Sequence, residues 1–162
     1  MHYVALAQVL ALISLANGSP VIAKRVLGDT YARPIDGDVR FADGRPLLGR
    51  SKTIRGVLIS LLVTALGALL LGLELKIGLL VAGTAMAGDL LSSFLKRRLG
   101  LAPSSKATGL DQVPEALFPL LACRSALSLT AIDIAVGCAI FFVGERLLSQ
   151  LFFRMHLRDR PY

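Results

Sequence analysis

The chain has 162 residues, of which 54% are hydrophobic and 18% are charged, and its mean hydropathy is +0.66. Soluble domains average about 45–50% apolar and about 25% charged residues, so this composition favours a membrane protein. The length allows one domain and leaves no room for a soluble catalytic domain beside a membrane anchor. A net charge of +7 in a soluble chain would point to nucleic acid, but aromatic residues make up only 6% and long uncharged stretches dominate. We therefore expect the partner of the basic residues to be the lipid bilayer, with no nucleic acid.

The cysteine and histidine content excludes several kinds of site. The two cysteines, Cys123 and Cys138, lie in apolar segments, which argues against a disulfide framework or a cysteine-rich zinc site. The two histidines, His2 and His156, lie at opposite ends of the chain. A histidine-based metal site or catalytic triad is therefore not expected.

Five apolar runs predict an all-α integral membrane protein with about five transmembrane helices, because about 20 helical residues cross a bilayer core. The runs cover residues 3–23, 56–73, 77–95, 113–132 and 134–153. The fourth is the weakest, since it contains Glu115, Pro119 and Arg124. The first run is followed, not preceded, by Lys24 and Arg25, which favours a retained anchor over a cleaved signal peptide.

The distribution of charge predicts the topology. Residues 24–55 hold eight Lys or Arg against four Asp, and residues 96–111 hold four against one. The segments between the other runs are neutral, so the positive-inside rule places the loops at about 24–55 and 96–112 and the C-terminus in the cytoplasm, with the N-terminus outside. We expect one membrane-embedded domain over residues 1–162, with its active site facing the cytoplasm.

Turn and kink signals mark three positions. Asp43-Gly44 favours a turn or short hairpin in the first loop. Pro20 should kink or end the first helix. Gly88, like the segment 17–20, would let a helix end or another backbone approach closely.

Asp89 is the first candidate functional residue, because a carboxylate inside a span is costly unless it pairs, binds an ion or lines a wet cavity. Asp89, Ser93, Lys96 and Arg97 form one polar stripe on a helix. A carboxylate followed along the same helix face by two basic side chains is the arrangement expected of a site that binds a metal-bound polyphosphate. The simpler alternative is an interfacial acid paired with Lys96.

Asp111 and Glu115 are a second pair of acids, one helical turn apart if the fourth helix begins near Asp111. Beside Asp89 they would form an oxygen-rich site, and magnesium usually binds through one or two carboxylates plus substrate phosphates. The alternative is that Asp111 caps the helix and Glu115 complements its dipole.

Basic residues precede the second span, where they would bind either anionic lipid headgroups or a phosphorylated substrate. They are Arg50, Lys52 and Arg55. Residues 44–51 read G-x-x-x-x-G-R-S, close to a P-loop, but the parallel-sheet context that a P-loop needs is missing, so we reject that interpretation.

Together these segments resemble the CDP-archaeol synthase family, small membrane CTP-transferases related to the phosphatidate cytidylyltransferases. The resemblance covers most of the predicted cytoplasmic half of the chain, and its segments follow the family's order. They are Asn17-Gly18-Ser19-Pro20, Pro34-Ile35-Asp36, Phe41-Ala42-Asp43-Gly44-Arg45, Lys52-Thr53-Ile54-Arg55-Gly56, the stretch 88–100 (G-D-x-x-x-S-x-x-K-R-R), Asp111-Gln112 and the ending 157–162. The family continues D-Q with a second aspartate, for which Glu115 would substitute here.

The resemblance implies transfer of CMP from CTP to a lipid phosphate in phospholipid biosynthesis, with release of pyrophosphate. The implied catalytic residues are Asp89, Asp111 and Lys96, and the implied Mg²⁺ ligands are Asp89, Asp111 and Glu115. The residues expected to bind CTP or the lipid phosphate are Asn17, Asp43, Lys52, Thr53, Arg55, Ser93 and Arg97.

Two other functions remain open at this stage. A phosphatidate cytidylyltransferase making CDP-diacylglycerol would use the same site. A small transporter or channel would need polar residues along the depth of several spans, whereas here the polar residues gather on one side of the membrane. Arg124 is the exception. We expect it either to pair with Asp133, to face a cavity, or to mark a wrongly drawn span. A homodimer is also expected for so small a membrane enzyme.

Overall fold

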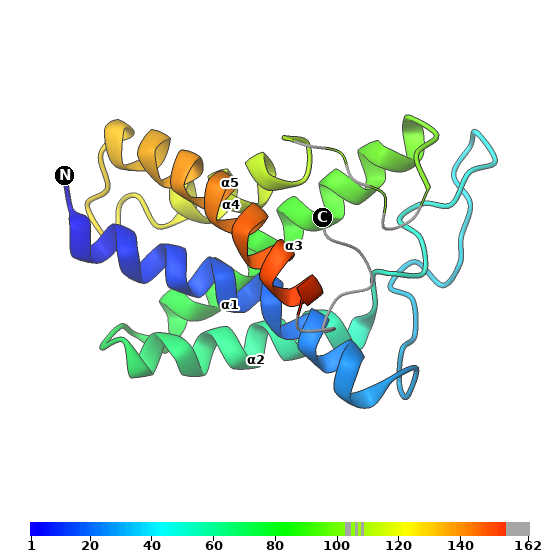
Figure 1. The fold of residues 1–162 in the computed structure, drawn as a ribbon, viewed down its shortest axis with the longest axis horizontal. Helices are drawn as coiled ribbons and strands as arrows, with labels where there is room; N and C mark the ends of the chain where they lie inside the picture. Colours follow the sequence, from blue (N-terminus) through cyan, green and yellow to red (C-terminus); the bar gives the residue numbers. More distant parts are fainter. Residues whose placement is uncertain (103–104, 106, 108, 155–162) are drawn as a thin grey trace.

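The computed structural model describes residues 1–102, 105, 107 and 109–154. In this part of the chain there are five α-helices and no β-strand (Figure 1): α1 (Tyr3–Leu27), α2 (Ile54–Leu70), α3 (Leu75–Arg98), α4 (Gln112–Ala122) and α5 (Ala131–Arg154). The predicted all-α class and the order of the five helices are confirmed.

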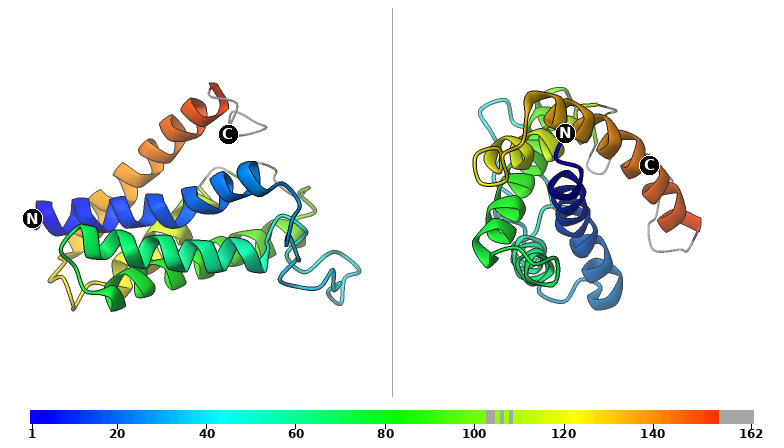
Figure 2. Two further views of the ribbon diagram at one scale, coloured as in Figure 1. Left: turned by 90° about the horizontal axis from the view of Figure 1, so that it is seen from below. Right: turned by 90° about the vertical axis from the view of Figure 1, so that its left-hand side faces the viewer.

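Helices α1, α2 and α3 pack side by side, and α4 lies against α3. Small residues allow the close contacts. A Cβ built on Gly78 of α3 would lie 2.7 Å from the Cα of Ala65 in α2, and one built on Gly88 would lie 2.4 Å from the carbonyl oxygen of Pro114 in α4. The predicted close approach at Gly88 is therefore confirmed. Figure 2 shows α5 slanting away from the other helices toward its C-terminal end.

Pro20 lies inside α1 and does not end it, because the helix continues to Leu27. A proline has no N–H to donate to the carbonyl four residues earlier, which here is that of Ala16. The buried hydroxyl of Ser60 in α2 donates to this carbonyl at 2.9 Å. The hydrogen bond lost within α1 is thus replaced by one that ties α1 to α2.

The helices differ in how well they match a membrane. By length and composition, α1 and α3 are long and apolar enough to cross a bilayer. Helix α2 has 17 residues and exposes a stripe of leucines, Leu58, Leu62, Leu66 and Leu69, that would face lipid. Helix α4 has only 11 residues, about 17 Å at 1.5 Å per residue, and ends at Ala122. It is half the length predicted for the fourth span, so the count of five spans stays a prediction.

The segment between α1 and α2 is an irregular loop pinned by two isolated antiparallel bridges, Pro34 with Thr53 and Arg40 with Pro46. Its tip turns at Gly44, whose φ of +76° is a conformation that glycine adopts readily. The N–H of Gly44 donates to the carbonyl of Phe41 at 2.9 Å. The turn predicted at Asp43-Gly44 is confirmed.

Candidate active site

The charged candidate residues gather at one end of the helical bundle. The end of α1, the α1–α2 loop and the end of α3 lie on the right of Figure 1, and α4 begins nearer the middle, beside α3. The opposite end is tied together by Asp133, which accepts hydrogen bonds from the N–H of His2 and from Thr130. The sequence prediction that polar groups cluster at one end is therefore confirmed for the described residues.

Lys52 and Asp89 form the central ion pair. The ammonium of Lys52 lies 2.6 Å from both carboxylate oxygens of Asp89, and each side chain is about four-fifths buried. Burial alone would lower the pKa of Lys52, but the Asp89 carboxylate more than offsets this, and the pKa is raised. Lys52 is therefore protonated at neutral pH.

Lys96 pairs with Asp111 instead of with Asp89. Its ammonium lies 2.6 Å from Oδ1 of Asp111, and it also donates to the carbonyl of Ser105 at 3.3 Å. The alternative in which Asp89 pairs with Lys96 is therefore wrong, and two ion pairs between different elements take its place. The reason is that the loop brings Lys52 onto α3, which sequence spacing along α3 alone does not reveal.

Asp111 and Glu115 both reach the site from the start of α4. Asp111 stands at the N-cap position, but its side chain makes no capping bond; Oδ2 instead accepts from the N–H of Ala107 at 3.1 Å. Glu115 is buried, and its Oε2 accepts from the amide of Asn17 in α1 at 3.0 Å. Its carboxyl also lies within interaction distance of Asp89 and Lys52. Asn17, Asp89 and Glu115 thus meet at this end of the bundle.

The donor set can be tested against a divalent cation. In the described residues no three histidine, cysteine or acidic side chains lie close enough together to hold one metal ion. The carboxyl groups of Asp89 and Glu115 do lie close together, and the Lys52 ammonium contacts Asp89 at the same place. Since Mg²⁺ needs only one or two carboxylates when phosphates supply the rest, this pair fits it.

Two predicted phosphate-binding residues are engaged in local structure. Thr53 caps α2, since its hydroxyl accepts from the N–H of Gly56 at 3.1 Å. Arg55 donates to the carbonyls of Gly28, at 2.9 Å, and Thr30. Its guanidinium therefore satisfies carbonyls just past the end of α1.

Asp43 docks the loop on α3. Its Oδ1 lies 2.6 Å from the guanidinium of Arg98, which also donates to the carbonyl of Pro46 at 2.5 Å. The same guanidinium stacks over the rings of Phe41 and Phe94, at 4.6 and 5.0 Å from the centroids. The role supported for Asp43 is therefore ordering of the loop.

The remaining predicted site residues, Ser93 and Arg97, are buried on α3 beside this cluster. The ending 157–162 lies outside the described residues. Arg124 does not pair with Asp133, whose carboxylate is occupied by His2 and Thr130; it is exposed just after α4.

Sequence reasoning missed residues that reach the site through the tertiary structure. Gln112 donates to Glu145 of α5 at 2.7 Å, and Glu145 acts electrostatically on Glu115. Arg45 donates to the carbonyl of Arg98 at 2.5 Å. The D-Q pair did mark Gln112, but nothing in the local sequence indicates that Glu145 faces the site.

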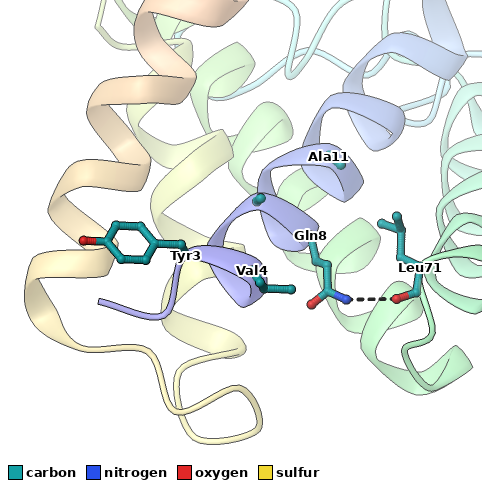
Figure 3. A pocket seen from close by; sticks show the side chains of 6 residues that line it. Tyr3, Val4, Gln8, Ala11 and Leu71 are labelled. Atoms are coloured by element: carbon teal, nitrogen blue, oxygen red, sulfur yellow. Dashed lines mark hydrogen bonds between the residues drawn. The ribbon is translucent and has the colours of Figure 1, made fainter.

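A separate apolar cavity of about 380 Å³ lies toward the other end of α1. Tyr3, Val4, Gln8, Ala11 and Leu71 line it in Figure 3, where Gln8 donates to the carbonyl of Leu71 at 2.9 Å. It has no charged lining residue. It is therefore suited to hydrocarbon and not to phosphate.

Comparison with known proteins identifies the family of this chain. The sequence profile of the CarS-like CDP-archaeol synthases matches residues 6–162. The chain is 34% identical over 154 residues to the CDP-archaeol synthase of Sulfurisphaera tokodaii, covering 91% of this chain and 89% of that one. It is 44% identical over 107 residues to that of Pyrococcus furiosus, covering 60% of each.

A solved structure is also similar. It belongs to an intramembrane enzyme for the biosynthesis of archaeal membrane lipids, with a TM-score of 0.67 and 32% identity over 83% of this chain and 88% of that one. The family profile spans the helices and the loop that carry the charged cluster. The chain belongs to the CarS-like CDP-archaeol synthase family of membrane proteins.

Proposed function

We propose that this protein transfers CMP from CTP to an archaeal-type unsaturated ether lipid phosphate, giving a CDP-lipid and pyrophosphate. Family membership supports the reaction, and one observation in the structure carries it. A buried cluster of lysines and carboxylates, Lys52 with Asp89 and Lys96 with Asp111, stands at the end of an apolar helical bundle. A charged site at the end of an apolar bundle can bind a lipid phosphate from the membrane and a nucleotide from the aqueous phase at the same time.

The reaction needs little proton transfer. A phosphate monoester with a second pKa of about 6 is already an anionic nucleophile at neutral pH. An oxygen of the lipid phosphate attacks the α-phosphorus of CTP, and the bond from that phosphorus to the oxygen bridging to the β-phosphate breaks. Pyrophosphate leaves with the electron pair. No general base is required, which suits a chain with only two histidines.

The task of the site is then charge neutralisation and positioning. The ammonium groups of Lys52 and Lys96 are held in place by Asp89 and Asp111 and can exchange part of that pairing for phosphate oxygens. Asn17 orients Glu115 toward Asp89. When bound, Mg²⁺ would neutralise phosphate charge, and Asp89 and Glu115, with Asp111 on the same side of the site, are the residues that would hold it.

The membrane orientation follows from charge. The loop before α2 and the end of α3 carry the basic residues, and the positive-inside rule puts this end in the cytoplasm, where CTP is found. The N-terminus and Asp133 then lie on the outer side. The lipid chains would lie among the apolar helices, beside leucines such as Leu58 and Leu62 that α2 exposes.

The lipid specificity is tested by direct competition. Purified protein in detergent receives labelled CTP, Mg²⁺ and equimolar geranylgeranyl ether phosphate and phosphatidate, and the products are separated by thin-layer chromatography. We expect CDP-lipid from the ether lipid in excess. Product from phosphatidate alone would instead identify a CDP-diacylglycerol synthase, and no product from either would contradict the proposal.

A further inference from the structure

Glu145 lies in α5, within the last of the apolar runs, and its carboxylate contacts the start of α4. Its Oε2 accepts a hydrogen bond from the side-chain amide of Gln112 at 2.7 Å, although the two residues are 33 positions apart in the chain. Gln112 is buried and Glu145 is half-buried. A carboxylate inside an apolar span is costly unless polar groups pair with it, so such a residue is a candidate for a functional role.

The other end of the Gln112 amide holds the loop before α4. Its Oε1 accepts from the N–H of Gly109 at 2.7 Å. Gln112 is also the first residue of α4, so this one side chain joins α5, the loop and the start of α4. Because both its donor and its acceptor are engaged, the amide has one orientation in the structure.

Two of the site carboxylates belong to the segment that Gln112 holds. Asp111 directly precedes Gln112, and Glu115 lies three residues after it, on a neighbouring position of the helix surface. Asp111 lies 2.6 Å from the ammonium of Lys96, and Glu115 accepts from Asn17 at 3.0 Å. A shift of the start of α4 would therefore move both carboxylates relative to their partners.

Helix α3 holds the same segment by contacts of its own. The hydroxyl of Ser92 donates to the carbonyl of Leu110 at 2.7 Å, and Gly88 approaches Pro114 closely. Helix α5 slants away from the other helices toward its C-terminal end (Figure 2). The bond from Gln112 to Glu145 is thus a polar contact through which this divergent helix bears on the site.

We propose that Glu145 is a positioning residue, which through Gln112 fixes the start of α4 and thereby the placement of Asp111 and Glu115. This inference rests on the proposed function, in which those carboxylates act. The role requires a hydrogen-bond acceptor at residue 145 and not a negative charge. Glutamine keeps an acceptor oxygen at the same reach, aspartate keeps the charge but draws the acceptor back by one methylene, and alanine has neither.

The kinetic test compares the three substitutions in full-length protein in detergent. We expect Glu145→Ala to lower kcat for CDP-lipid formation about tenfold and to leave KM for the lipid phosphate within about twofold, because misplaced groups slow the chemical step. Glu145→Gln should recover most of this loss and Glu145→Asp less of it. If the alanine variant does not fold, the contrast between glutamine and aspartate still decides. Glu74→Ala is the matched control, since Glu74 pairs with Lys76 on the exposed surface.

A second measurement does not depend on turnover. Thermal unfolding of Gln112→Ala, Glu145→Ala and the double variant, without Mg²⁺ or substrate, forms a double-mutant cycle. Because each single substitution breaks the same hydrogen bond, we expect the double variant to lose less stability than the sum of the single losses. The same cycle measured on kcat should show little further effect of Glu145→Ala once Gln112 is replaced.

Three outcomes would overturn the positioning role. A loss of kcat in Glu145→Gln as large as in Glu145→Ala, with Glu145→Asp active, would show that the charge itself acts on the substrate or the metal ion. Unchanged kcat in Glu145→Ala would show that the site does not need this contact. Additive losses in both cycles would contradict transmission through Gln112. Failure of the proposed function looks different, because wild-type protein would then form no CDP-lipid while the stability cycle stayed non-additive.

Discussion

Lys52 and Asp89 are 37 residues apart in the chain, yet the lysine ammonium lies 2.6 Å from both oxygens of the carboxylate. This contact joins the loop before α2 to the first residue of the polar stripe on α3. It fixes the loop over the place where Asn17, Asp89 and Glu115 meet.

Replacing Asp89 should remove turnover without unfolding the protein. Asp89→Asn keeps the side-chain shape but removes the charge that balances Lys52 and that would help to hold Mg²⁺. We expect kcat/KM for CDP-lipid formation to fall about 100-fold or more, and the Mg²⁺ concentration for half-maximal activity to rise. Asp38→Asn, in an exposed ion pair with Arg50, is the control. Full activity in Asp89→Asn would refute its role as a metal ligand.

Removing the metal ion should stop CDP-lipid formation, as removing the Asp89 carboxylate should. Excess EDTA is expected to stop CDP-lipid formation by the wild-type protein, and added Mg²⁺ to restore it, because the phosphate charges then lack neutralisation. The rate is measured with labelled CTP before and after readdition. Undiminished turnover after chelation would mean that the lysines alone neutralise the phosphates.

The two site lysines should act on substrate binding. Lys52→Ala and Lys96→Ala each leave a buried carboxylate without its partner and remove a phosphate donor, so we expect KM for CTP or for the lipid phosphate to rise about tenfold. Steady-state kinetics with each substrate varied separates the two. Lys76→Ala is the matched control, since Lys76 pairs with Glu74 on the exposed surface at the start of α3. Unchanged kinetics in both variants would show that the two lysines contribute only to the membrane topology and not to substrate binding.

The hydrogen bond from Ser60 to Ala16 should stabilise the fold because Pro20 makes it necessary. Ser60→Ala leaves a buried carbonyl unsatisfied, at a cost of about 1–3 kcal/mol in the free energy of unfolding. In a Pro20→Ala background the restored N–H can bond to Ala16 within α1, so the same serine substitution should cost less. Thermal unfolding of both pairs of variants forms the cycle. Equal costs in the two backgrounds would contradict the replacement of one hydrogen bond by the other.

Asp36 should make the loop acid-sensitive. Partial burial opposes ionisation, but N–H groups of Gly49 and Leu48, at 3.0 and 2.8 Å, outweigh it and lower the pKa below 3.8. Because the folded pKa is the lower one, the stabilisation is present above pH 3.8 and is lost as the pH falls through the folded value. We expect Asp36→Asn to lower the midpoint of thermal unfolding by a constant amount between pH 5 and 7, about the range where the carboxylate is ionised in both states. The difference should shrink below pH 3.8; a difference that persists there would rule out ionisation as its source.

The helical class, the basic end of the bundle and the acids Asp89, Asp111 and Glu115 could be predicted because hydropathy and charge act locally along the chain. The ion-pair and hydrogen-bond partners of these residues could not be predicted. Helical spacing offered Lys96 as an alternative partner of Asp89, but the loop supplies Lys52 instead. Glu145 and Arg45 reach the site only through the packing of α5 and the docking of the loop. The fourth apolar run predicted a helix of full membrane-spanning length, but α4 ends at Ala122. Hydropathy shows that a segment is apolar and does not show whether it forms one continuous helix.

The central claim is that an oxygen of the lipid phosphate forms its new bond with the α-phosphorus of CTP. The most direct measurement supplies purified protein, Mg²⁺ and geranylgeranyl ether phosphate with CTP labelled either at the α-phosphate or at the γ-phosphate. We predict that the α-label enters the lipid fraction and the γ-label leaves as pyrophosphate, in equal amounts. Transfer of the γ-label to lipid, or release of the γ-label with no labelled lipid from the α-labelled CTP, would contradict cytidylyl transfer.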